Sequence, residues 1–170
     1  GVDRFITRVK SYSSETMDPK VKHQSRGNFV LAELEANDRS KDTLPILLDI
    51  DGNISEGIGY NVFMVKDGVL KTPLDKNILQ GIARSVILDL AAQAKLPCVE
   101  CDIQPYDLYT ADEVFFTRTS PRIIPVSTVD GRQIGDGKPG VMTRNLLAAH
   151  SELVDVDIVG QAKYYSETQS

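Results

Sequence analysis

The spacing of apolar residues divides the chain into helices and strands. Apolar positions that recur every three or four residues predict helices, which are expected over residues 27–37, 78–94, 106–111 and 141–153. Alternating or continuous apolar runs predict strands, which are expected over residues 2–12, 44–49, 61–65, 69–72, 98–103, 114–117 and 123–126. The helix over 78–94 has the most regular pattern, and its first turn is expected to contain Gly81.

The order of these elements predicts the fold class. Strands and helices follow one another without the regular alternation that builds a parallel sheet, and no segment repeats. We therefore expect an α+β fold or a distorted barrel.

Composition and charge narrow the possible partners and compartment. With 170 residues, 41% of them hydrophobic, the chain is long enough for one domain with a real core. Its 19 basic and 24 acidic residues give a formal net charge of -5, and no run of Lys and Arg matches a row of phosphates, so nucleic acid is not an expected partner. No apolar run reaches the roughly 18 residues of a membrane span, and the first residues have no secretory pattern, so we expect a cytoplasmic protein without a membrane partner.

The two cysteines have the spacing of a CxxC motif but lie in a predicted strand. Residues three apart in a strand point to opposite faces, which separates Cys98 from Cys101. No second Cys or His pair is present to complete a metal site. Two packed thiols and no metal are therefore expected.

Three polar clusters have both a chemical and a structural interpretation. Asp49-Ile-Asp-Gly-Asn53 resembles the nucleophile motif of haloacid-dehalogenase-like phosphatases, but a turn and strand follow it instead of a helix, so an Asp-rich turn is favoured. The stretch 117–122 is either an anion cradle of hydroxyls and amides or a polar connection between strands, and by itself the connection is favoured. The glycines in 130–137 favour a hairpin over a phosphate loop.

Seven segments, each weak alone, follow one another in the order and spacing of a known family. They are residues 18–23, 48–63, 66–73, 78–84, 111–115, 119–126 and 130–132. Together they resemble the class IV (fold-type IV) pyridoxal-phosphate-dependent aminotransferases, most of all the branched-chain amino acid aminotransferases, over nearly the whole chain. This resemblance implies an α+β fold with a distorted mixed β-barrel flanked by helices, as in the large domain of D-amino acid aminotransferase-like enzymes.

The resemblance implies a cofactor, pyridoxal 5'-phosphate, and residues that bind it. Lys22 matches the catalytic lysine, whose amine holds the cofactor covalently and then moves a proton. Glu56 matches the carboxylate that keeps the pyridine nitrogen protonated. Ile82 and Ala83, at a helix start, match the phosphate-binding amides, and Thr119 matches a second phosphate contact.

The resemblance also places Tyr60, Ser120 and Pro121 beside the substrate, but it leaves the substrate open. Pro121 has no N–H to offer a substrate carboxylate, and Arg26 and Tyr60 are more like the residues of amine transaminases. We expect transamination between a branched-chain or similar apolar amino acid and a 2-oxo acid. The alternatives are an (R)-selective amine or D-amino acid transaminase, and a catalytically silent binding or structural domain.

Family members begin with a smaller domain, and Gly1 falls near the joint between the two domains. The resemblance therefore implies that residues 1–170 are the C-terminal, large cofactor-binding domain and that the N-terminal small domain is absent from this chain. It also implies a homodimer.

Overall fold

The computed structural model describes residues 2–22, 25–40, 43–119, 123–161 and 164. These residues form a nine-stranded sheet. The strands are β1 (Val2–Lys10), β2 (Leu44–Leu48), β3 (Ile54–Gly57), β4 (Tyr60–Lys66), β5 (Val69–Thr72), β6 (Cys98–Glu100), β7 (Glu113–Thr117), β8 (Ile123–Val129) and β9 (Arg132–Gln133). The helices are α1 (Gly27–Asn37), α2 (Ile82–Gln93), α3 (Pro105–Tyr109), α4 (Val141–Val154) and a 3-10 turn, η1 (Asp75–Asn77).

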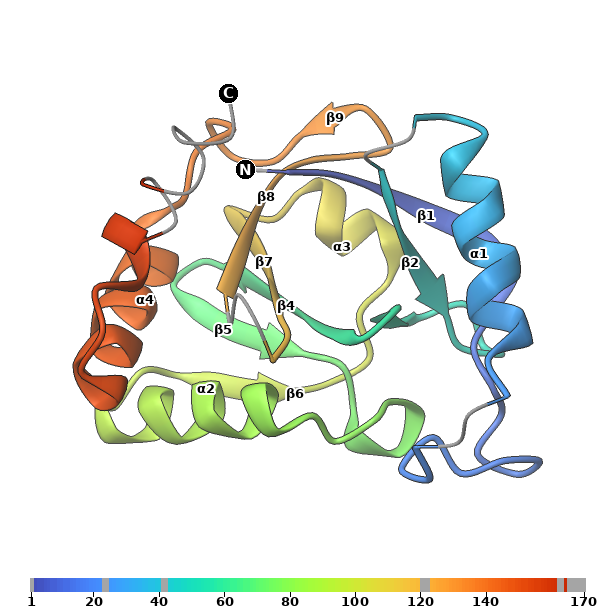
Figure 1. The fold of residues 1–170 in the computed structure, drawn as a ribbon, viewed down its shortest axis with the longest axis horizontal. Coiled ribbons are helices and arrows are strands. Elements are labelled where there is room, and N and C mark those ends of the chain that lie inside the picture. The colour runs from blue at the N-terminus through green and yellow to red at the C-terminus, as the bar shows by residue number, and fades with distance from the viewer. Residues whose placement is uncertain (1, 23–24, 41–42, 120–122, 162–163, 165–170) are drawn as a thin grey trace.

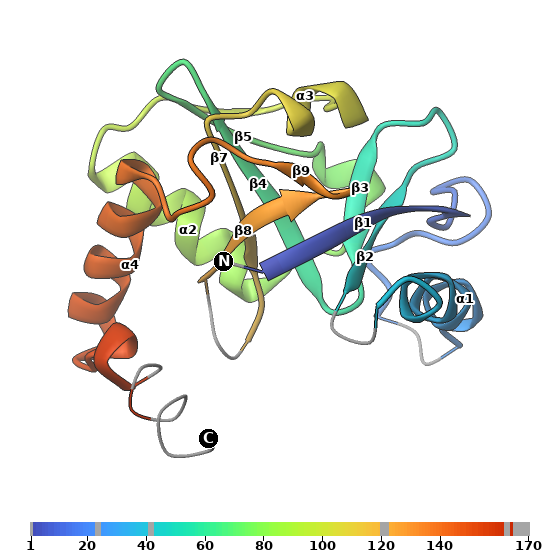
Figure 2. The same ribbon diagram turned by 90° about the horizontal axis from the view of Figure 1, so that it is seen from above.

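Six of the strands close into a barrel (Figures 1 and 2). The order β3-β2-β1-β8-β7-β4 returns to its start because β3 also pairs with β4. Strand β1 is parallel to β2 and β8, and the other neighbours around the ring are antiparallel. Strands β5, β6 and β9 lie outside the ring. The expected α+β fold with a mixed barrel is therefore confirmed.

Apolar side chains fill the barrel and the layer beneath the helices. Inside the barrel, residues such as Val62 and Phe116 form one cluster, which Leu108 of α3 joins. Helix α3 lies over one end of the barrel (Figure 1). Outside the barrel, Phe63 and Phe115 pack with Ile87 of α2 in a second cluster that α4 also covers. Because neighbouring residues in a strand point to opposite faces, β4 contributes Val62 to the inner cluster and Phe63 to the outer one. Helix α1 packs over β1 and β2.

The predicted helix over 78–94 begins later than its apolar pattern indicates. Ile78 has extended dihedral angles, and Gly81 is the extended residue before the helix, which starts at Ile82. Gly81 is thus not in the first turn, and that prediction was wrong. The apolar pattern continues through Ile78 because this side chain is fully buried although the chain there is not helical.

Two of the polar clusters prove to be turns. The Asp49 carboxylate accepts hydrogen bonds from the backbone N–H groups of Asp51 and Asn53, and β3 follows, which confirms the Asp-rich turn and removes the helix that a phosphatase motif needs. Strands β8 and β9 form the predicted hairpin.

The two cysteines lie on opposite sides, as predicted. Cys98 packs with the cluster under α2, and Cys101 packs with the cluster inside the barrel. Burial raises the pKa of both thiols. In the described part of the chain, no helix combines the length and apolar character that crossing a membrane requires.

Candidate active site

One polar cavity of about 210 Å³ brings together residues from four separate segments. The segments are the stretch before α1, the β3–β4 hairpin, the start of α2 and the end of β7. The cavity is lined by Lys22, Arg26, Glu56, Gly59, Tyr60, Asn61, Leu79, Gln80, Gly81, Ile82, Ala83, Thr117, Arg118 and Thr119. It contains every predicted site residue except Ser120 and Pro121, which lie outside the described residues.

Glu56 is the buried acid of this cavity. Its side chain projects from β3, is 6% exposed, and accepts a hydrogen bond of 3.1 Å from the backbone N–H of Leu79. Burial raises the pKa of Glu56 to about 7, although that hydrogen bond and the charge of Arg26 both oppose the rise. Burial makes the ionised form of this carboxylate unfavourable, so the group attracts a cation or takes up a proton near neutral pH.

Lys22 lies in the irregular segment before α1 and is exposed. It lines the polar cavity and also a smaller adjoining one that shares Arg26, Glu56 and Leu79. No carboxylate in the described part of the chain forms an ion pair with Lys22. Among the described residues, therefore, no acidic side chain engages the Lys22 amine in an ion pair.

The N-terminus of α2 forms one wall of the cavity. Gly81 provides no side-chain cap to this 12-residue helix, so the first backbone N–H groups, those of Ile82 and Ala83, have no partner within the helix. Close packing favours glycine at this position, because a Cβ on Gly81 would lie 2.4 Å from Oδ1 of Asn61 and would displace that side chain. Asn61 is itself fixed by a hydrogen bond of 2.9 Å from Nδ2 to the carbonyl oxygen of Leu79.

Tyr60 lines the cavity but is only 3% exposed. Its hydroxyl donates a hydrogen bond of 2.6 Å to the carbonyl oxygen of Pro45, and its ring stacks on Phe116 with centroids 4.5 Å apart. Burial raises the pKa of Tyr60. The part of Tyr60 that remains for a ligand is thus the ring and not the hydroxyl.

The end of β7 adds Thr117 and Arg118, which reasoning from the sequence did not assign, beside the predicted Thr119. Thr119 and its neighbour Arg118 are both exposed and line the cavity. Thr117 is 1% exposed, and its Oγ1 has no hydrogen-bond partner among the described residues. The only sequence signal for Thr117 and Arg118 is the hydroxyl-rich composition of the stretch 117–122, a candidate anion cradle. That composition does not indicate which residues of the stretch line the cavity.

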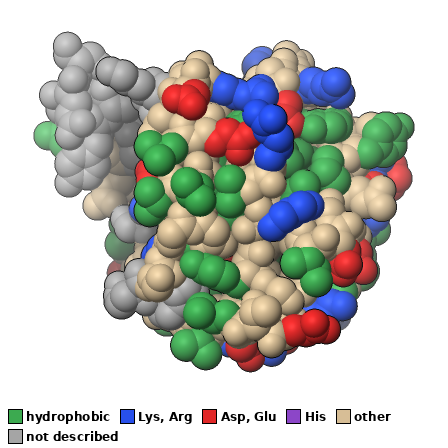
Figure 3. All heavy atoms as spheres, turned by 90° about the vertical axis from the view of Figure 1, so that its right-hand side faces the viewer, with side chains coloured by type: hydrophobic (Ala, Val, Ile, Leu, Met, Phe, Trp, Pro, Cys, Tyr) green, Lys and Arg blue, Asp and Glu red, His purple; other side chains and the backbone are tan. Residues whose placement is uncertain are grey.

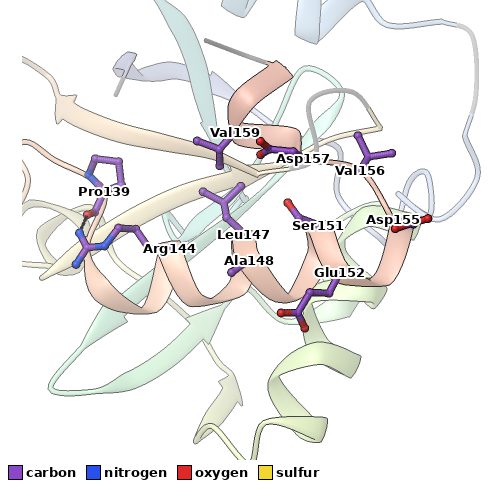
Figure 4. Close-up of a pocket in the computed structure, with 10 residues that line it drawn as sticks. All are labelled: Pro139, Arg144, Leu147, Ala148, Ser151, Glu152, Asp155, Val156, Asp157 and Val159. Atoms are coloured by element: carbon purple, nitrogen blue, oxygen red, sulfur yellow. Dashed lines mark hydrogen bonds between the residues drawn. The ribbon is translucent and has the colours of Figure 1, made fainter. Parts of the chain in front are cut away.

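A larger cavity of about 720 Å³ lies beside α4 and contains none of the predicted residues (Figure 4). In the close-up, the side chains of Leu147 and Val159 point toward one another, whereas Glu152 and Asp155 point to different sides. The lining is largely apolar and brings no polar groups to a common point. Convergent polar groups distinguish a catalytic site better than volume does, so the smaller polar cavity is the candidate active site.

The groups in the polar cavity fit a phosphorylated ligand with a cationic ring. Uncapped helix amides attract a phosphate, and a buried carboxylate attracts a protonated ring nitrogen. The Lys22 amine, which pairs with no carboxylate of the described residues, is able to react with an aldehyde. Among the lining residues, three cationic side chains, Lys22, Arg26 and Arg118, accompany a single acid, Glu56. This excess of positive charge favours anionic ligands.

Comparisons with known proteins agree with this chemistry. The branched-chain-amino-acid aminotransferase of Pseudomonas aeruginosa is 42% identical over 127 residues, which are 75% of this chain and 41% of that protein. The solved Escherichia coli branched-chain amino acid aminotransferase has a TM-score of 0.84 and 36% identity, covering 90% of this chain and 51% of that one. The T.th. branched-chain amino acid aminotransferase, solved in complex with N-(5'-phosphopyridoxyl)-L-glutamate, has a TM-score of 0.81 and 32% identity, covering 89% of this chain and 51% of that one.

The chain thus spans about half the length of the relatives that it matches. The family model of amino-transferase class IV matches residues 2–129, which include the whole lining of the polar cavity. The members of this family depend on pyridoxal phosphate. The chain therefore belongs to the class IV aminotransferases.

Proposed function

We propose that the protein carrying this chain is a pyridoxal-phosphate-dependent aminotransferase that moves an amino group between a branched-chain or similar apolar amino acid and a 2-oxo acid. The observation that carries this proposal is the meeting of Lys22, Glu56 and the uncapped start of α2 in one polar cavity. The 42% identity to a branched-chain aminotransferase supports the substrate class.

Each of these groups has a defined task. The Lys22 amine binds the cofactor covalently and carries a proton to and from the substrate carbon. The Glu56 carboxylate holds the proton on the pyridine nitrogen, and the amides of Ile82 and Ala83, with Thr119, bind the phosphate. When bound, pyridoxal phosphate supplies an electron sink for the bond that breaks at the substrate carbon.

The charges in the cavity support an amino acid substrate over a simple amine. Once a cationic ring nitrogen offsets Glu56 and a phosphate occupies the α2 amides, the guanidinium groups of Arg26 and Arg118 remain for a further anion. Within the described part of the chain, neither guanidinium forms an ion pair with a carboxylate. A substrate carboxylate would supply that charge.

The alternative, an (R)-amine or D-amino acid transaminase, is motivated by Arg26, Tyr60 and Pro121, because the resemblance makes Arg26 and Tyr60 more like residues of amine transaminases and Pro121 has no N–H for a substrate carboxylate; Arg26 and Tyr60 both line the cavity. A half-reaction panel of L-leucine, D-alanine and an (R)-arylalkylamine separates these functions. We expect L-leucine to convert the cofactor fastest. A response to the amine alone would contradict the branched-chain assignment.

The catalytic role of Lys22 has a direct test in the full-length protein. Borohydride reduction should fix pyridoxal phosphate to the wild-type protein and to the matched variant Lys20→Ala, and it should leave Lys22→Ala unlabelled in a mass spectrum. Covalent labelling of the Lys22→Ala variant would show that Lys22 is not the residue that binds the cofactor covalently. A wild-type protein that neither absorbs as a cofactor complex nor forms a 2-oxo acid would instead be a silent binding domain.

We further propose that residues 1–170 form the C-terminal, larger domain of this enzyme and that a smaller N-terminal domain completes the site. The proposal rests on the resemblance and on the chain's covering about half of its relatives. The 170-residue chain alone should then have little transaminase activity compared with the full-length protein. Full turnover by these residues would overturn this domain assignment.

We also propose that the enzyme is a homodimer. Helix α1, which follows the Lys22 segment, leaves three apolar side chains 52–58% exposed, those of Val30, Leu31 and Leu34. Figure 3 views the side of the molecule that carries α1 and shows hydrophobic side chains spread over it. An apolar helix face beside a site supports contact with another subunit.

A further inference from the structure

The polar cavity contains a buried hydroxyl that its surroundings leave without a hydrogen bond. Thr117 is the last residue of β7 and is 1% exposed, and its Oγ1 has no partner among the described residues. Buried polar atoms are nearly always paired, because an unpaired hydroxyl loses its hydrogen bonds to water without replacement. A ligand that accepts a hydrogen bond would remove this cost.

The strand register places this hydroxyl beside the start of α2. Asn61 lies opposite Thr117, and Phe63 lies opposite Phe115, so these four side chains share one face of the β4–β7 pair. Phe63 and Phe115 pack beneath α2. Two residues further along the same face, Asn61 reaches Leu79 and Gly81, and Thr117 lines the cavity next to it.

The groups around this hydroxyl favour an anion. The backbone N–H groups of Ile82 and Ala83 have no partner within the helix, and both residues line the same cavity as Thr117. Ala83 itself has no hydroxyl to offer. A threonine Oγ1 is able to donate one hydrogen bond, which is what a phosphate oxygen requires of it.

We propose that Thr117 is a further cofactor-binding residue, whose Oγ1 donates a hydrogen bond to the phosphate group at the start of α2. This inference rests on the proposed function, which supplies the phosphate monoester. It gives this hydroxyl a hydrogen-bond acceptor in the ligand. It therefore predicts that the hydroxyl lowers the stability of the free protein and raises its affinity for the cofactor.

The test compares two ligands that differ only in the phosphate. Full-length apo-protein is titrated with pyridoxal phosphate and with pyridoxal, and binding is followed by absorbance. Thr117→Val keeps the shape and removes the hydroxyl, so pyridoxal phosphate should bind about ten-fold or more weakly, whereas pyridoxal should bind about as before. Thr117→Ser keeps a hydroxyl and should bind pyridoxal phosphate nearly as well as the wild-type protein.

Thermal unfolding of the apo-protein provides a second readout with the opposite sign. Thr117→Val should unfold at the same temperature as the wild-type protein or higher, because it removes an unpaired buried hydroxyl. The control is Thr72, which is fully buried and donates from Oγ1 to the carbonyl oxygen of Val62 at 2.8 Å. Thr72→Val should unfold at a lower temperature and keep the wild-type affinity for pyridoxal phosphate.

The possible failures are distinguishable. Equal affinity of Thr117→Val and wild-type protein for pyridoxal phosphate would overturn this inference alone, as would an equal loss of affinity for both ligands or a lower unfolding temperature of the apo-variant. If the wild-type protein does not bind pyridoxal phosphate, both the proposed function and this inference are wrong.

Discussion

Replacing the buried acid of the cavity should stabilise the free protein while it impairs the enzyme. Glu56 is 6% exposed, and its burial raises its pKa from the ordinary 4.5 to about 7. The folded protein therefore binds this proton more tightly than the unfolded chain does. The contribution of Glu56 to stability is complete below pH 4.5, decreases as the pH rises from 4.5 to 7, and stays reduced above pH 7.

The magnitude follows from the size of that rise. A change of one in pKa corresponds to about 1.4 kcal/mol, so the rise to about 7 costs roughly 3 kcal/mol of unfolding free energy once Glu56 is ionised. Glu56→Gln removes the charge, and its side-chain oxygen is able to keep the hydrogen bond from Leu79. The variant should thus gain up to roughly 3 kcal/mol at pH 8 and much less at pH 5.

Urea unfolding of the apo-protein at pH 5, 6, 7 and 8 measures this difference. The stability advantage of Glu56→Gln should grow between pH 5 and 7 and then level off, whereas Glu15→Gln, at an exposed position, should follow the wild-type protein throughout. With cofactor bound, the same Glu56→Gln protein should transaminate slowly, because a neutral amide does not hold the proton on the ring nitrogen. An advantage that is independent of pH, or a less stable variant at pH 8, would refute the reasoning.

Three further substitutions test the frame around the site. Gly81 has dihedral angles that alanine also adopts, but the Cβ of Gly81→Ala displaces the Asn61 side chain, so this variant should lose about 1 kcal/mol of unfolding free energy in urea and bind cofactor more weakly in an absorbance titration. Asp49→Ala removes the acceptor for the N–H groups of the turn and for the Asn77 amide, and it should lose roughly 2–4 kcal/mol in the same urea assay. Leu34→Glu should convert the dimer to a monomer in light scattering after gel filtration, whereas Val99→Glu, at an exposed apolar position on β6, should leave it dimeric.

Local patterns were enough to predict most of the elements but not their ends. The helix α1 has the predicted bounds of residues 27–37, although two of its apolar residues, Val30 and Leu34, are exposed and the buried face is formed by Phe29, Ala32 and Ala36. For α2 the spacing misled, since Ile78 is fully buried while its backbone is extended. Burial alone does not distinguish a helix from an extended segment that lies against the same core.

The candidate site depends on contacts that no local pattern contains. Lys22 and Thr119 are far apart along the chain and line one cavity because the barrel closes through the β3–β4 pairing and through two parallel neighbours of β1. The family resemblance named these residues without giving their surroundings. The raised pKa of Glu56 and the unpaired hydroxyl of Thr117 are consequences of burial, which only the folded structure defines.

One short segment connects the two ends of the proposed cofactor site. Asn77 donates from its side-chain amide to Asp49 at 2.8 Å, which fixes η1 to the turn before β3. Two residues later, Leu79 donates its N–H to Glu56 and accepts a hydrogen bond from Asn61. Helix α2 begins three residues after Leu79. The spacing between the buried carboxylate and the helix amides is therefore set by the irregular stretch 77–81, which is hydrogen-bonded to the rest of the site on both sides. Such a frame suits a rigid ligand with a cationic ring at one end and a phosphate at the other.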